Sequence, residues 1–195
     1  MDLLEACDNG DLNRVKKLIK AGADLEIQDE DEQTPLTTAM NNCNFDIVEE
    51  LVLCGANVDR KVYGIPMIMW TDHLEMIKIL LNNGADPNAT NEDYSENALF
   101  VPSRWKDVEI IEELIAAGIN VNAQNKYGHT PLYEAISHLN LECVKVLLEA
   151  GANPNILTNA KQSPLYKIRI LKESYIDSSK KNKILELLKQ HGAKE

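Results

Sequence analysis

The residues with the chemistry for metal binding or nucleophilic catalysis are four cysteines and four histidines in a chain of 195 residues. No two cysteines form a Cys-x-x-Cys pair, and no histidine lies at metal-ligand spacing from a cysteine. No histidine is paired with an acid at a spacing that indicates a catalytic triad. The Gly-x-Ser-x-Gly, His-Glu-x-x-His and phosphate-loop motifs are also missing from the sequence. We therefore expect no enzyme, no cofactor and no metal site.

The glycines instead mark a repeat. The phrase Gly-Ala-(Asp/Asn)-x-(Asn/Asp) recurs with its glycines 33, 29, 34, 33 and 41 residues apart. A second phrase, of the Thr-Pro-Leu type, recurs at steps of 31, 32, 33 and 33 residues. Two landmarks that keep one period indicate about six copies of one structural unit. The glycines are Gly22, Gly55, Gly84, Gly118, Gly151 and Gly192, and the second residues of the other phrase are Pro35, Pro66, Ala98, Pro131 and Pro164.

One unit can be interpreted from residues 128–155. Thr130 can cap a helix whose first position is Pro131, where a missing amide donor is harmless. The run 141–150 places apolar residues on one stripe of a 3.6-residue period, which indicates a second helix. Gly151 supplies the left-handed residue that ends it. Each unit is thus predicted to be helix, turn, helix and extended loop.

These phrases resemble the ankyrin repeat, and the resemblance covers essentially the whole chain. It implies an all-α repeat solenoid of antiparallel helix pairs joined by hairpin loops, curved and L-shaped in section. A single repeat cannot bury its apolar face, so stability should come from stacking neighbours. We expect one domain with approximate repeats 1–28, 29–59, 60–90, 91–124, 125–157 and 158–195.

The repeat positions also place the cysteines. Cys7 and Cys143 should face the interior of the stack, whereas Cys43 lies in an inter-helix turn and Cys54 just before a helix-ending glycine. We interpret all four as reduced thiols, which are typical of a reducing compartment. The acidic residues 1–5 do not resemble a signal peptide, and no apolar run approaches the ~20 residues that cross a bilayer. A cytoplasmic protein is expected.

The resemblance implies a protein-binding surface on the concave face, formed by the hairpin tips and the exposed side of each first helix. Carried over one residue at a time, it gives contact positions in the second, fifth and sixth repeats. These positions are Asp29, Glu30, Asp31, Gln33, Asn41, Asn42, Lys126, Tyr127, His129, Ser137, His138 and Arg169. His73 stands where such repeats often carry a histidine between the helices, which implies a structural role.

The third and fourth repeats depart from the pattern. The third is short by two residues in its hairpin and by two in its first helix or turn. The fourth carries Pro102 where a helix interior is expected, and we expect it to end or kink that helix early. Aromatic residues gather in this irregular stretch, and aromatic residues with a polar group are favoured at binding hot spots. The predicted contacts are Tyr63, Trp70, Tyr94 and Trp105. Tyr94, Trp105 and Tyr127 fall at positions that a regular repeat would expose. For Trp70, as for Phe100, filling the space left by the shorter helix is an equally good interpretation.

Charge indicates the partner. Residues 1–160 carry 11 basic and 27 acidic side chains, whereas residues 161–195 carry 9 basic and 4 acidic ones, which gives the net charge of −11. An acidic surface disfavours nucleic acid and steers a basic protein. The favoured hypothesis is a monomer that masks a basic toxin or enzyme, as an inhibitor or immunity-type protein. The alternative is a structural adaptor or a host-directed microbial effector with several partners.

Three further features stay open at this point. Asn88, Asn122 and Asn155 occupy the hairpin position that asparaginyl hydroxylases modify in ankyrin domains, although Asn is also a preferred turn residue. The last repeat holds eight surplus residues near 172–182, either a loop or a helix extension. Its lysines serve either as a solubilising cap or as a basic docking patch.

Overall fold

The Thr-Pro and Ser-Pro phrases begin helices, as the sequence predicts. In the computed structural model, which describes residues 2–171 and 178–194, the Thr130 hydroxyl accepts the backbone N–H of Tyr133 at 3.2 Å, and Pro131 opens helix α8 (Pro131–Ser137). Thr34 and Ser163 cap α3 (Pro35–Asn41) and α10 (Pro164–Ile170) in the same way. Each cap satisfies an amide that would otherwise lack a partner in the first helical turn.

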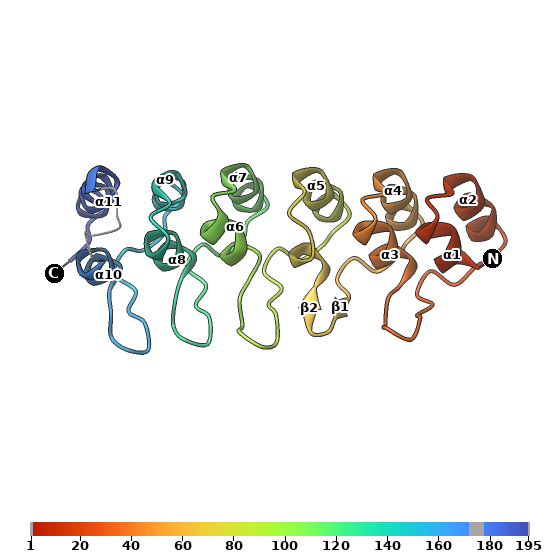
Figure 1. Cartoon of the computed structure of the whole chain (residues 1–195), viewed down its shortest axis with the longest axis horizontal. Helices are drawn as coiled ribbons and strands as arrows, with labels where there is room; N and C mark the ends of the chain where they lie inside the picture. The colour runs from red at the N-terminus through yellow and green to blue at the C-terminus, as the bar shows by residue number, and fades with distance from the viewer. Residues whose placement is uncertain (1, 172–177, 195) are drawn as a thin grey trace. The chain divides into compact units, whose positions relative to one another are not determined.

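The chain divides by its contacts into two units, residues 1–86 and 87–195. In the first unit, α1 packs against α2 and α3 against α4, while α1 also lies on α3 and α2 on α4 (Figure 1). The third repeat adds a hairpin, a 3-10 turn and α5, and α5 packs on α4. The remaining bounds in this unit are α1 (Leu3–Asp8), α2 (Leu12–Lys20), α4 (Phe45–Leu53), β1 (Lys61–Val62), β2 (Ile65–Pro66), η1 (Met67–Met69) and α5 (Leu74–Asn82).

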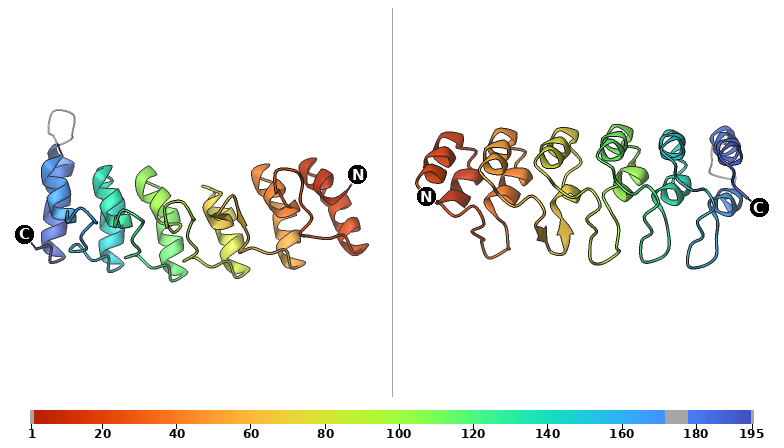
Figure 2. Two further views of the ribbon diagram at one scale, coloured as in Figure 1. Left: turned by 90° about the horizontal axis from the view of Figure 1, so that it is seen from below. Right: turned by 180° about the vertical axis from the view of Figure 1, so that it is seen from behind.

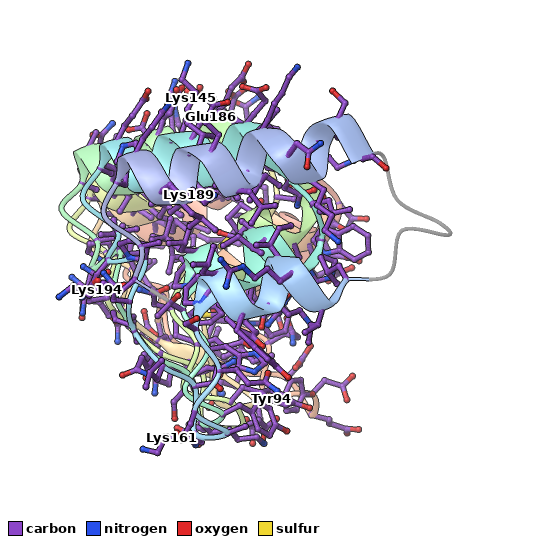
Figure 3. All side chains as sticks on the ribbon, turned by 90° about the vertical axis from the view of Figure 1, so that its left-hand side faces the viewer. Tyr94, Lys145, Lys161, Glu186, Lys189 and Lys194 are labelled. Carbon is purple, nitrogen blue, oxygen red and sulfur yellow. The ribbon has the colours of Figure 1, made fainter. Side chains whose placement is uncertain are left out.

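The second unit has the same plan. First helices α6, α8 and α10 lie side by side, second helices α7, α9 and α11 form the neighbouring row, and loops project beyond the first row (Figures 1 and 2). The remaining bounds are α6 (Phe100–Trp105), α7 (Val108–Ala116), α9 (Leu141–Glu149) and α11 (Ser178–Gln190). Figure 3 shows Tyr94 and Lys161 at the loop end of the unit, and Lys145 and Glu186 at the opposite end. Hairpin tips and second helices therefore present separate surfaces.

The irregular repeats have short first helices. In the third repeat a single 3-10 turn, Met67–Met69, replaces the seven-residue helix seen at α3 and α8. Its hairpin is an antiparallel pair in which Lys61 lies opposite Pro66 and Val62 opposite Ile65. In the fourth repeat the expectation for Pro102 was wrong. Helix α6 begins only at Phe100, so Pro102 stands in the first turn, where its missing N–H breaks no hydrogen bond.

Asparagine and acidic side chains hold successive repeats together within each unit. In the second unit, the Oδ1 atom of Asn88 accepts the backbone N–H of Asn120 at 2.7 Å, and Asn122 does the same for Asn153 at 2.7 Å. In the first, the carboxylate of Asp59 accepts the N–H of Asp86 at 2.7 Å. The periodic residues of the Gly-Ala phrase therefore stabilise the stacking of repeats. Hydroxylation of these asparagines stays a prediction.

The core is formed by the apolar stripes of the helices. Phe100, Leu36, Ile77 and Leu132 are among the largest fully buried side chains, and Cys7 and Cys143 are buried as predicted. Burial raises the pKa of the Cys7 thiol to about 12 and that of Cys143 to about 11. Among the described residues, no helix is long and apolar enough to span a bilayer.

The last repeat is described only in part. Of the surplus near 172–182, residues 172–177 lie outside the described residues. The rest, from Ser178 onward, belongs to α11. Lys181 is buried there, and its ammonium group donates to the carbonyl of Leu171 at 2.8 Å. This lysine therefore ties α11 to the end of α10, which neither interpretation of the basic residues foresaw.

Candidate protein-binding surface

The hairpin tips of the second unit carry three side chains in mutual contact, Tyr94, Lys126 and Tyr127, which we call the tip cluster. The Lys126 ammonium lies 4.0 Å from the Tyr94 ring centroid and 5.3 Å from that of Tyr127, and it donates to the Asp93 carbonyl at 2.7 Å. The two rings are 6.4 Å apart, with Tyr94 44% and Tyr127 50% exposed. Cation–π attraction and the carbonyl contact therefore fix two exposed aromatic rings.

Backbone hydrogen bonds join neighbouring tips. The N–H of Lys126 donates to the Tyr94 carbonyl at 2.8 Å, and that of Asn159 donates to the Tyr127 carbonyl at 3.0 Å. The approach is close at Gly128, where an added Cβ would lie 2.6 Å from the Asn159 nitrogen, and its φ is +76°. Only glycine fits this position. The tips therefore form a connected surface in which each hairpin supports the next.

A network of charged groups, which we call the ionic cluster, lies beneath the tips. Arg104 donates to both carboxylate oxygens of Glu96 and, at 3.3 Å, to Glu134. Glu134 also lies 2.8 Å from Nδ1 of His129, and the Asn125 amide donates to Glu96 at 3.1 Å. Glu96 is 5% and Glu134 8% exposed. One guanidinium therefore bridges two buried carboxylates drawn from different repeats.

The electrostatics of this cluster favour the charged forms of Glu134 and Arg104. Burial alone would raise the pKa of Glu134, but the hydrogen bond with His129 and the charge of Arg104 hold it below the ordinary value. Burial alone would lower the pKa of Arg104, but Glu96 and Glu134 raise it above its ordinary value. The His129 ring is thereby held with its centroid 4.5 Å from that of Tyr133 and 6.0 Å from that of Tyr127. The cluster thus positions the tip from below.

Trp105, the last residue of α6, is 73% exposed, so its predicted exposure is confirmed together with that of Tyr94 and Tyr127. Within the described part of the chain, the ring contacts join Tyr94 to Tyr127 and do not include Trp105. Of the other predicted contacts in this unit, Ser137 donates to the Tyr133 carbonyl at 2.8 Å. His138 and Arg169 are exposed at the first helices α8 and α10.

In the first unit, the predicted acidic docking positions Asp29, Glu30 and Asp31 are all exposed at a hairpin tip. Asp29 is partly engaged, because its carboxylate accepts the backbone N–H groups of Asp31 and Gln33 at 2.9 and 2.8 Å. The Tyr63 hydroxyl donates to the Asp31 carbonyl at 2.7 Å. Local desolvation and the neighbouring carboxylates of Asp31 and Glu32 raise the pKa of Tyr63. This tip is acidic, with an aromatic ring against it.

Three more predicted contacts in this unit are occupied by neighbours. The Asn41 amide donates to the Gln33 side chain at 3.1 Å, and that of Asn42 donates to the Asp8 carboxylate at 3.0 Å. Trp70 is half-buried and donates through Nε1 to the Ile65 carbonyl at 3.2 Å, where it lies against the shortened hairpin. The space-filling interpretation of Trp70 gains support, and Phe100 is fully buried.

Sequence analysis missed the ionic cluster. Its members Glu96, Arg104 and Glu134 are eight to 38 residues apart, and each alone is an ordinary charged residue of a helix or loop. One feature could have indicated the cluster. Glu134 occupies the inner side of α8, where the neighbouring residues are apolar. Within residues 2–171 and 178–194, no group of three or more histidine, cysteine or acidic side chains has the geometry to hold a metal ion.

Comparison with known proteins assigns the fold. The chain matches the family of ankyrin repeats (3 copies) over residues 3–91 and 67–158. An ankyrin repeat domain from Acinetobacter baumannii AYE has a TM-score of 0.89 and 30% identity, covering 98% of both chains. The ankyrin repeat protein EF0377 has a TM-score of 0.82 at 23% identity, covering 96% of each, which shows the fold alone. The chain therefore belongs to the ankyrin repeat family, and its predicted fold, an all-α repeat solenoid, is confirmed.

Curated relatives have the same repeats in different settings. The ankyrin repeat protein YahD of Escherichia coli K12 is 30% identical over 69% of this chain and 69% of its own length. A Dictyostelium discoideum relative, named as a serine/threonine-protein kinase, is 32% identical over 65% of this chain. The chain spans only 17% of that relative and 22% of a fowlpox virus ankyrin repeat protein. Ankyrin repeat domains generally mediate protein–protein interaction, and this family is a non-catalytic interaction module.

Proposed function

We propose that this chain binds one protein partner through the hairpin tips and first helices of its second unit. The observation that carries the proposal is the tip cluster, two exposed tyrosines fixed around Lys126 and supported by the ionic cluster below. Exposed aromatic rings that are already held in place lose little conformational entropy when a partner binds. Trp105 extends the aromatic surface along α6 and is the second anchor of the proposal.

The partner we propose is a basic protein. The acidic tip of the first unit, Asp29, Glu30 and Asp31, and the net charge of −16 over residues 1–160 favour a cationic surface. Lys126 is exposed, and its ammonium is already in contact with two rings and a carbonyl of its own chain. In the concrete form of the proposal, the chain is a cytoplasmic, monomeric inhibitor that masks a basic toxin or enzyme. It has no catalytic role and needs no cofactor.

Two physical features support that setting. All four cysteines are free thiols, which suits a reducing compartment. The proposed contact residues, furthermore, lie on hairpins and first helices whose backbone groups are hydrogen-bonded to neighbouring repeats. A surface held in this way changes little on binding, which favours capture of one partner of fixed shape.

The test is affinity capture from native extract with the wild type and a Trp105→Ala, Tyr127→Ala double variant, at low and moderate salt. Loss of two aromatic anchors should lower the affinity for the specific partner by several hundredfold, since each hot spot contributes about 2 kcal/mol. Leu53→Ala is the matched control, because Leu53 is 76% exposed but lies on the second helix α4.

The captured protein is then purified, and its dissociation constant and association rate are measured directly. The proposal is supported by a single basic partner whose binding weakens as salt rises and is lost in the double variant. Several partners that are indifferent to salt and to both substitutions would indicate the adaptor or effector role and remove the tip cluster from the binding surface.

A further inference from the structure

Two side chains of the first unit, Cys43 and His73, lie together although 30 residues separate them. The Sγ atom of Cys43 is 3.2 Å from Nε2 of His73, within hydrogen-bonding distance for sulfur. Cys43 is exposed, and half of the His73 side chain is open to solvent, so a reagent can reach the pair. The sequence predicted a reduced thiol in an inter-helix turn for Cys43 and a structural role for His73, and did not bring the two together.

The stacking of repeats explains the contact. In two other repeats, the residue just before the second helix reaches back to the preceding repeat. The Asn44 amide donates to the Cys7 carbonyl at 3.1 Å, and the Asn140 amide donates to the Ser103 carbonyl at 2.7 Å. His73 stands at the same position before α5, and its ring meets the side chain of Cys43 instead of a carbonyl. The pairing is therefore a consequence of the repeat geometry.

The geometry also holds the two groups in place. Cys43 has a φ of +54°, the left-handed conformation that glycine adopts at the matching turn position Gly10. The His73 ring contacts that of Phe45 edge to face, with centroids 6.0 Å apart and an interplanar angle of 72°. The imidazole is thus kept beside the sulfur by an aromatic neighbour, and the thiol is kept there by its turn.

This arrangement is suited to nucleophilic sulfur chemistry. The thiol can donate its proton to Nε2 of the neutral imidazole, which leaves a thiolate beside an imidazolium, and the thiolate is the reactive form of cysteine. The Asp72 carboxylate lies 3.9 Å from the same Nε2 atom. Asp46 lines a hollow beside Cys43.

The other three cysteines differ from Cys43. Cys7 and Cys143 are fully buried, and no reagent reaches them without unfolding. Cys54 is exposed, but its sulfur lies 3.9 Å from a carboxylate oxygen of Glu50, and a carboxylate is a weaker base than an imidazole. The chain thus contains its own comparison, one exposed thiol beside an imidazole and one exposed thiol beside a carboxylate.

We propose that Cys43 is a modification site that exchanges with low-molecular-weight disulfides, with His73 as its proton acceptor. The Cys43 thiolate attacks one sulfur of the disulfide, the S–S bond of the reagent breaks, and a new S–S bond joins the reagent's half to Cys43. The departing thiolate takes the proton held by the His73 imidazolium and leaves as a thiol. Cys43 is oxidised and the released half is reduced, so the exchange needs no other reactant.

The surroundings of the pair favour a cationic disulfide. The hollow beside Cys43 is lined by Gly10, Leu12, Phe45 and Asp46, among others, and is large enough for a short chain. Because Asp46 lines this hollow and the Asp72 carboxylate lies 3.9 Å from His73 Nε2, an ammonium group on the reagent is attracted and a carboxylate is repelled. Cystamine should therefore react faster at Cys43 than oxidised glutathione does.

The test treats the folded chain with cystamine at neutral pH and follows the adduct at each cysteine by peptide mass spectrometry. An ordinary thiol is only a few per cent ionised at pH 7, so full ionisation would raise its rate of disulfide exchange about thirtyfold. The lower nucleophilicity of a more acidic thiol offsets part of this increase. We expect Cys43 to react about five- to tenfold faster than Cys54, with Cys7 and Cys143 unmodified.

The decisive variant is His73→Asn, because the chain itself carries asparagine at the matching positions 44 and 140, so the repeat should fold. It should slow Cys43 to about the rate of Cys54 while Cys54 stays unchanged, and Cys43→Ser should remove the fast adduct altogether. Equal rates at Cys43 and Cys54 in the wild type would overturn the proposal. So would a Cys43 rate that His73→Asn leaves unchanged, or that falls together with the Cys54 rate.

Discussion

The substitution Arg104→Met tests whether the ionic cluster stabilises the second unit. Arg104 is the cation shared by Glu96 and Glu134, whose exposed fractions are 5% and 8%. Methionine keeps much of the side-chain volume but leaves both carboxylates buried without a guanidinium. Breaking a buried ion pair by removing one partner costs about 3–5 kcal/mol. Because the Arg104 side chain is itself 27% exposed, solvent screens part of the loss, and we expect about 2–4 kcal/mol.

Urea unfolding measures this loss. A decrease of that size lowers the urea midpoint by about 1–2 M for an m-value of about 2 kcal/mol/M. A Trp70→Phe background leaves Trp105 as the sole tryptophan, so its fluorescence reports the second unit. The matched control is Lys145→Met, which breaks an exposed pair with Glu149 at 3.9 Å and should change stability by no more than about 0.5 kcal/mol.

The pH dependence separates an ionic cause from a packing cause. The pKa of Glu134 is lowered by folding, so its contribution is fully present above its ordinary value near 4.5 and is lost as the pH falls through the lowered value. In Arg104→Met, protonation removes the charge of the buried carboxylates and so stabilises the folded state. The difference in unfolding free energy between wild type and Arg104→Met should therefore decrease as the pH falls. A difference in unfolding free energy below about 1 kcal/mol at pH 7, or a difference that is the same at pH 4 as at pH 7, would refute the reasoning.

Two further predictions concern the hairpins and the irregular repeats. Gly128→Ala should cost about 2–3 kcal/mol in urea unfolding, because its Cβ would meet the Asn159 nitrogen at 2.6 Å and φ is +76°. The control Gly151→Ala, with positive φ but open space, should cost about 1 kcal/mol, and equal costs would show that the clash is relieved. Amide hydrogen exchange should be faster in residues 60–75 and 94–106 than in 128–151, because the first two segments have only a 3-10 turn or a six-residue first helix; uniform protection would contradict this.

Much of the fold could be predicted because each repeat is specified by local signals. Thr130 and Pro131 begin α8 and Gly151 ends α9, as their residue types dictate. The prediction for Pro102 was wrong because a helix can begin later than its neighbours and move the proline into its first turn. The period gives the position of a helix but not the residue at which it begins, which in α6 is the fully buried Phe100.

The candidate site was predictable only for side chains whose exposure follows from the repeat. Tyr94, Trp105 and Tyr127 are exposed as expected, since hairpin tips and helix ends face solvent in every repeat. Trp70 could not be assigned, because the shortened third repeat changes the register, and in the structure its indole N–H finds the Ile65 carbonyl. Whether any of these residues contacts a partner stays a prediction.

The sequence by itself determined the family, the helix pairs, the buried cysteines and the acidic character of the chain, because each of these depends on residue type and a period of about 33 residues. Only the tertiary structure decided which side chains meet across repeats. It joined Arg104 to Glu134 and Cys43 to His73, each pair 30 residues apart. Stacking places equivalent positions of adjacent repeats within contact distance, but the rotamer and burial of each side chain decide whether a contact forms. These contacts therefore emerge only when the repeats pack.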